Sequence, residues 1–74
     1  MDAYARQLAQ IAANVRAARE ATGLSQVRFA QRAEIDTTTL NRIERGRADP
    51  TARTLLKIAR AAGVPVSELM RDVE

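Results

Sequence analysis

The fold is decided by residues 24–46, which read LSQVRFAQRAEIDTTTLNRIERG. Ser25 is a good N-cap for a short helix over about 26–33. Leu24 precedes this cap and Phe29 follows it by four residues, so the two are placed to pack together as a hydrophobic staple. The first part of the stretch therefore predicts a short helix with a defined start.

A second helix follows after a turn at residues 34–35. Asp36 can cap this helix, in which Leu40 and Ile43 point inward. Gly46 then ends the helix. The stretch as a whole predicts two short helices joined by a tight turn.

The flanking sequence predicts three further helices. Apolar residues recur every three or four positions over about residues 4–22, and Gly23 ends this first helix. Thr51 caps a fourth helix, and a short fifth lies near the C-terminus. Because no stretch alternates like a strand, we expect an all-α fold, a compact five-helix bundle in a single domain over residues 1–74.

The last helix is predicted from a proline and a serine. Pro65 disfavours a helical backbone at the residue before it, so residues 64–66 are expected to be extended. Ser67 then begins a last turn or two, with Leu69 and Met70 as its apolar anchors.

Cysteine and histidine are both absent from the sequence. Their absence excludes a disulfide framework, the usual zinc sites, Cys nucleophiles and Ser-His-Asp triads. The two serines, Ser25 and Ser67, are both expected to be helix caps. The composition therefore predicts a binding module and not an enzyme, with no metal and no cofactor.

Positive charge is concentrated in the middle of the chain. Residues 16–60 hold ten basic and five acidic side chains, net +5, whereas residues 61–74 hold one basic and three acidic, net −2. All but one of the basic residues are Arg, which forms bidentate contacts with phosphate and guanine that Lys cannot. A GC-rich genome is an alternative cause of this composition. No apolar run approaches the roughly 18 residues of a membrane helix, so we expect a soluble, cytoplasmic protein with no membrane partner.

A pattern spread over the predicted helices carries a resemblance to a known family. It consists of Leu24-Ser25-Gln26, Phe29-Ala30-x-x-Ala33, Leu40-x-x-Ile43-Glu44-Arg45-Gly46, Pro50-Thr51 and Leu55-Leu56-Lys57-Ile58-Ala59. Over about residues 12–70 the chain resembles the Xre family, the helix-turn-helix domains of the phage lambda repressor and Cro type. The resemblance implies a sequence-specific DNA-binding domain, usually dimeric, whose third helix lies in the major groove.

The chain departs from the family pattern in two places. Residues 1–10 precede the usual start, and Glu34 stands where the family usually has Gly in the turn. If the turn keeps the left-handed backbone for which the family uses Gly, Glu34 stores roughly 1 kcal/mol of strain.

The third helix supplies the candidate base contacts. Thr37 and Thr38 stand at its tip, where a hydroxyl can bond a base edge or phosphate and a methyl can touch thymine. Thr also suits a first helical turn for structural reasons, which is the role expected of Thr39. Arg42 is the main candidate, because its forked donors fit the O6 and N7 acceptors of guanine. Asn41 could pair with adenine, contact a phosphate or point sideways.

Phosphate contacts are expected around that helix. In the Xre pattern the Gln at the start of the second helix touches the DNA backbone, so Gln26 is expected to face outward. Arg45 and Arg47 flank Gly46, and Arg53 lies in the first turn of the fourth helix. Such a cluster is sometimes only a solubilising surface, but the dense charge of DNA favours it.

The resemblance also implies a structural ion pair. Arg19 occupies the last full turn of the first helix, and Glu44 directly follows the core position Ile43. In the Xre arrangement the two face each other where the first and third helices meet. We therefore assign them to an ion pair and not to DNA contacts.

Two functions fit these features. The first is a transcription regulator that binds an operator in double-stranded DNA, expected to be an inverted repeat, as a homodimer. A restriction-modification controller, a phage or plasmid repressor and an autoregulating antitoxin are its variants. The second is a protein-interaction module that binds a partner such as a toxin, with DNA contact secondary. RNA polymerase is a further possible partner, through Glu34.

The dimer interface is expected on the terminal helix. Val66, Leu69 and Met70 are the candidates, because so short a helix cannot bury all of them in its own small core. The alternative surface is Leu8 with Ile11 on the extended first helix.

Overall fold

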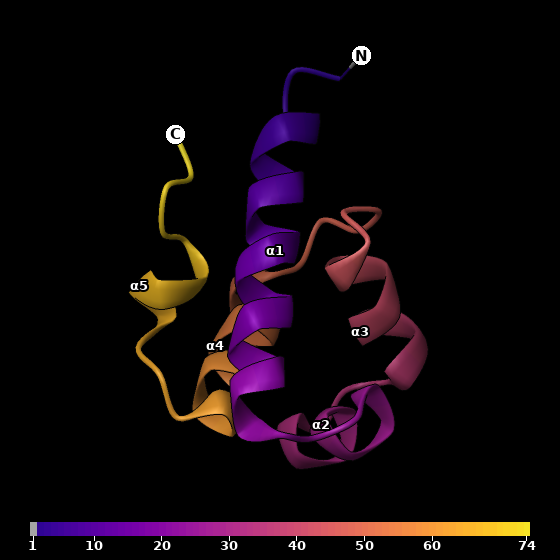
Figure 1. Ribbon diagram of the computed structural model, residues 1–74. Helices are drawn as coiled ribbons and strands as arrows, with labels where there is room; N and C mark the ends of the chain where they lie inside the picture. Colours follow the sequence, from indigo (N-terminus) through magenta and orange to yellow (C-terminus); the bar gives the residue numbers. More distant parts are fainter. Residues whose placement is uncertain (1) are drawn as a thin grey trace.

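This computed structural model describes residues 2–74, which form five helices joined by turns and loops. They are α1 (Ala5–Thr22), α2 (Gln26–Ala33), α3 (Thr37–Glu44), α4 (Ala52–Ala62) and α5 (Val66–Leu69). In Figure 1, α1 runs through the centre, with α3 on one side and α4 and α5 on the other. Helix α2 packs against α3 and α4 at the C-terminal end of α1. The predicted all-α fold is confirmed.

Local side-chain chemistry fixes where α2 and α4 begin. Ser25 Oγ accepts a hydrogen bond from Arg28 N at 3.2 Å, and Thr51 Oγ1 accepts one from Thr54 N at 3.1 Å. Each bond satisfies one of the amide groups that have no partner in the first turn of a helix. Helix α3 also begins after its predicted cap, Asp36, although the Asp36 side chain makes no capping hydrogen bond.

All five helices contribute to one core. Its largest fully buried side chains are Val15, Phe29, Leu40, Ile43, Ile58 and Leu69. Each such side chain stabilises the fold by about 1.5–3 kcal/mol relative to an exposed position. Ile11 is also buried, so it cannot serve in the alternative dimer surface, where only the half-buried Leu8 remains. Burial of the apolar side of α3 also leaves the opposite side of that helix facing outward.

Helix α5 begins one residue earlier than predicted. Val66 is its first residue, whereas the sequence indicated Ser67, so Ser67 lies inside the helix and is not its cap. The physical reason is that a proline restricts the residue before it and leaves the residue after it free to be helical. Pro65 itself is extended, with φ −68° and ψ 151°, and acts as the N-cap.

Leu69 is fully buried, which corrects its assignment to a dimer interface. Carbonyl groups at the end of so short a helix have no helical partner, and Asn14 of α1 supplies one. Its Nδ2 donates hydrogen bonds to Leu69 O at 3.0 Å and Arg71 O at 2.8 Å. Met70, expected to be an apolar anchor of this last turn and a candidate for the dimer interface, is 40% exposed, and Val66 is 37% exposed.

Glu34 adopts the left-handed backbone, with φ 59° and ψ 46°. A side chain with a Cβ atom is strained there, and glycine is not. We expect Glu34→Gly to raise the free energy of unfolding by about 1 kcal/mol, which is about 4–8 °C in Tm for a domain of this size. Thermal unfolding followed by circular dichroism measures the shift. Glu34→Ala keeps the Cβ atom and should gain much less; an equal gain would assign the effect to the lost carboxylate.

Candidate nucleic-acid interface

The outer side of α3 carries the candidate base contacts. Leu40 and Ile43 point into the core and Glu44 is buried beside them, so the polar residues on the opposite side of the helix face outward. Thr38 and Arg42 are exposed, and Thr37 and Asn41 are half-buried beside them. The structure therefore brings all four polar residues together along one strip of the helix surface.

A tight turn holds the backbone at the C-terminal end of α3. Gly46 is left-handed, with φ 70°, and its N–H donates to Ile43 O at 3.0 Å. Arg47 N then reaches back to Arg42 O at 2.8 Å. These two bonds satisfy carbonyls of the last turn, as in a Schellman motif. The turn thus fixes the position of the Arg47 backbone relative to the strip of α3.

Arg42 lies on this strip, and three further arginines follow it along the chain. Arg42, Arg45, Arg47 and Arg53 are all exposed. Within residues 2–74 none of them forms an ion pair, although the exposed Asp49 lies in the same loop as Arg47. Their positive charge is therefore free to meet an external anion such as a phosphate.

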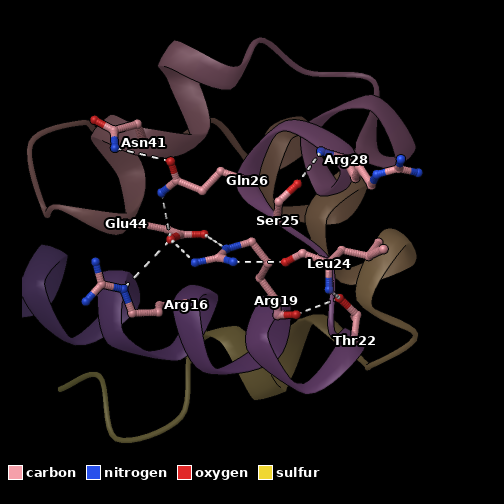
Figure 2. A network of polar contacts seen from close by, with 9 residues as sticks. All are labelled: Arg16, Arg19, Thr22, Leu24, Ser25, Gln26, Arg28, Asn41 and Glu44. Atoms are coloured by element: carbon pink, nitrogen blue, oxygen red, sulfur yellow. Dashed lines mark hydrogen bonds and ion pairs between the residues drawn. The ribbon is translucent and has the colours of Figure 1, made fainter.

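A buried ion pair supports the strip from the inner side of α3. Arg19 Nε donates to Glu44 Oε2 at 2.7 Å, and Arg19 Nη2 donates to Glu44 Oε1 at 3.1 Å (Figure 2). Arg19 Nη1 also donates to Leu24 O at 2.9 Å, which ties the turn between α1 and α2 into the same cluster. The hydrogen bond to Glu44 raises the pKa of the Arg19 guanidinium, although burial opposes the shift.

Gln26 and Asn41 extend this cluster to the surface, which the sequence did not predict. Gln26 Nε2 donates to Glu44 Oε1 at 3.0 Å, and Asn41 Nδ2 donates to Gln26 Oε1 at 3.3 Å. The amide of Gln26 therefore turns towards α3, which corrects the expectation that it simply faces outward. The reason is that a buried carboxylate attracts the nearest available donor. One N–H of Gln26 remains for a contact outside the protein.

Arg16 is a further member that sequence reasoning missed. Its Nε lies 3.8 Å from Glu44 Oε1, and its side chain is 55% exposed. Its position could have indicated this contact, because Arg16 lies one helical turn before Arg19 and on the same face of α1.

Residues 2–74 contain no group of three or more His, Cys, Asp or Glu placed to hold a metal ion. No helix among them is long and apolar enough to cross a membrane.

Two short helices at a tight turn, with an arginine-flanked polar strip on the second, define a DNA-binding module. The sequence model of the helix-turn-helix family matches residues 15–69. The chain therefore belongs to the helix-turn-helix family, and the predicted resemblance over about 12–70 is confirmed. This is a family of DNA-binding regulators and not an enzyme family.

Two known proteins show how far the similarity extends. The control protein C.MunI of Mycoplasma sp. is 38% identical over 56 residues, which cover 76% of each chain. The crystal structure of the restriction-modification controller protein C.AhdI from Aeromonas hydrophila superimposes with a TM-score of 0.87 at 28% identity. That alignment covers 92% of this chain and 99% of C.AhdI. These similarities favour a DNA-binding transcription regulator over a protein-interaction module.

Proposed function

We propose that the protein is the controller of a restriction-modification system, a transcription regulator that binds its operator as a homodimer. The observation that carries this proposal is the extent of the similarity to C.AhdI. It covers 92% of this chain, and so reaches beyond the family match at 15–69. The relative found by sequence, C.MunI, is also a control protein. Such a regulator acts on its own or a neighbouring gene, in the cytoplasm, where the DNA is.

In this proposal α3 enters the major groove. The outward strip of Thr37, Thr38, Asn41 and Arg42 then faces the base edges, where hydrogen bonds carry sequence information. The flanking contacts go to phosphates and fix the orientation of the domain without reading sequence. The residues proposed for them are Gln26, Arg45, Arg47 and Arg53.

The homodimer follows from the small size of the reading surface. One short helix can contact only a few base pairs, so a two-fold dimer on an inverted repeat supplies the missing specificity. Val66 and Met70 lie one helical turn apart and are both partly exposed, which supports α5 as the interface. Leu69 shapes this surface from below and does not contact the partner.

A charge placed at the C-terminal end of α5, at its C-cap Met70, should therefore prevent dimerisation. We expect Met70→Asp to shift the protein to monomers, because a carboxylate buried between two subunits loses its hydration. Sedimentation equilibrium at micromolar concentration measures the change. Leu56→Asp is the matched control, since Leu56 on α4 is also apolar and is 57% exposed. If Leu56→Asp breaks the dimer and Met70→Asp does not, the interface lies on α4.

Selection of bound DNA from a random pool, followed by mobility shifts in rising salt, tests the proposed function. The expected product is an inverted repeat that binds one dimer. Affinity should fall steeply with salt, since each phosphate contact releases counterions. Recovery of DNA with no common sequence would contradict the proposal and support a protein-interaction module.

A further inference from the structure

We infer that the buried Glu44 sets which way the amide of Asn41 faces the DNA, and that Asn41 therefore reads adenine. Gln26 transmits this orientation. The inference rests on the proposed function, because it requires α3 to lie in the major groove. It adds two positioning residues, Glu44 and Gln26, neither of which reads a base itself.

The first step is the contact between Glu44 and Gln26. The side chain of Glu44 has no exposed surface, and Arg19 pairs with both of its oxygens. A carboxylate only accepts hydrogen bonds, so the group that meets it must be a donor. Gln26 Nε2 lies 3.0 Å from Glu44 Oε1. The opposite orientation of the Gln26 amide would bring two acceptor oxygens together, which the buried charge disfavours.

The second step passes this orientation to α3. With its nitrogen held by Glu44, Gln26 directs Oε1 towards Asn41, whose Nδ2 donates to it at 3.3 Å. The nitrogen of Asn41 therefore points back into the protein, and its oxygen points away from Gln26, as Figure 2 shows. The three side chains thus form a relay from the interior to the outer surface of α3.

The third step compares the hydrogen-bonding groups of the Asn41 amide that remain unused with those that each base presents in the major groove. Its Oδ1 acceptor and one N–H donor remain side by side. Adenine offers the matching pair, the N6 amino donor and the N7 acceptor. Guanine offers two acceptors, O6 and N7, so Oδ1 of Asn41 would face another oxygen. A cytosine amino group can pair with the oxygen alone. The relay therefore favours adenine and acts against guanine.

The test begins with the operator that the native protein selects. Asn41→Ala identifies the base pair that Asn41 contacts, because changes at that pair no longer alter binding by the variant. We expect adenine there, preferred about 5- to 140-fold over other bases by the native protein. Replacing that adenine with 7-deazaadenine removes N7, and replacing it with purine removes the amino group. Each replacement should weaken native binding.

Gln26→Met then tests the relay itself. Met has a similar length and shape but no amide, and Glu44 keeps its bonds to Arg19. We expect the preference for adenine to fall at least severalfold, because the amide of Asn41 is then free to turn over. Gln31→Met is the matched control, since Gln31 is an exposed Gln on the same helix outside the cluster. Its preference should equal that of the native protein.

The ratio of affinities between bases is the decisive readout. The comparison uses four operators that differ only in the base at the position contacted by Asn41. If Gln26 only held a phosphate or stabilised the fold, Gln26→Met would weaken binding equally on all four. An unchanged ratio, or a G·C base pair at the contacted position, would overturn the inference while an inverted repeat left the proposed function intact. A native protein without sequence preference would overturn both.

Discussion

Replacement of Arg19 with methionine should lower the free energy of unfolding by about 3–5 kcal/mol. The side chain of Glu44 is fully buried, and the variant removes the guanidinium that contacts both of its oxygens. Arg16 cannot replace it, because its Nε is 3.8 Å away and its side chain is 55% exposed. Since native proteins have about 5–15 kcal/mol in total, this loss would remove a large part of the stability.

Urea denaturation measures the effect, and two further variants interpret it. Arg16→Met is the matched control and should cost less than about 1 kcal/mol, because the Arg16 side chain is 55% exposed and its Nε lies 3.8 Å from the carboxylate. Arg19→Met combined with Glu44→Met should recover most of the loss, because it removes the buried charge as well. Equal losses in Arg16→Met and Arg19→Met would show that the pair is not the stabilising contact.

The upward shift in the pKa of Arg19 should not make stability depend on pH in the ordinary range. A group whose pKa is raised by folding stabilises the fold below its unfolded pKa, and this stabilisation is lost only as pH rises through the folded value. For Arg19 the hydrogen bond to Glu44 shifts the pKa upward from its ordinary, already alkaline value. The window of loss therefore lies at more alkaline pH than any working buffer.

Helix boundaries could be predicted from the sequence because they depend on neighbouring residues. Ser25 and Thr51 bond amides only three positions away, and Gly23 is left-handed, with φ 76°, as expected at the end of a helix. In both cases the energetic reason lies within one turn of chain. The left-handed backbone at Glu34 was considered only as a condition, because the family usually has Gly at that position, and the structure shows that the condition is met.

The rest depended on contacts between residues far apart in sequence. Asn14 is buried on α1 and bonds carbonyls 55 and 57 residues later, so nothing near it indicates that α5 ends there. Leu69 was assigned to the surface for the same reason. Gln26 and Asn41 were each expected to contact DNA, but their mutual contact requires the packing of α2 against α3.

Removal of the Arg42 side chain should reduce affinity in a way that depends on the DNA sequence. Arg42 is exposed on the outer strip of α3, where its fork of donors can meet the O6 and N7 acceptors of a guanine. We expect Arg42→Ala to cost about 1–3 kcal/mol on the selected operator. On an operator mutated at that base pair the same substitution should cost much less, because the contact is already lost.

Arg47→Ala is the matched comparison, since Arg47 is also exposed but lies beyond Gly46, outside the strip. If Arg47 holds a phosphate, its removal should weaken binding to specific and random DNA by similar factors. It should also reduce the slope of log affinity against log salt by about one unit. Titrations of both variants on two operators at three salt concentrations separate the two roles.

Should Arg42→Ala lower affinity equally on every sequence, α3 would not be placed in the groove as proposed. Thr37, Thr38 and Asn41 would then lose their assigned contacts as well, because all four share one strip of that helix.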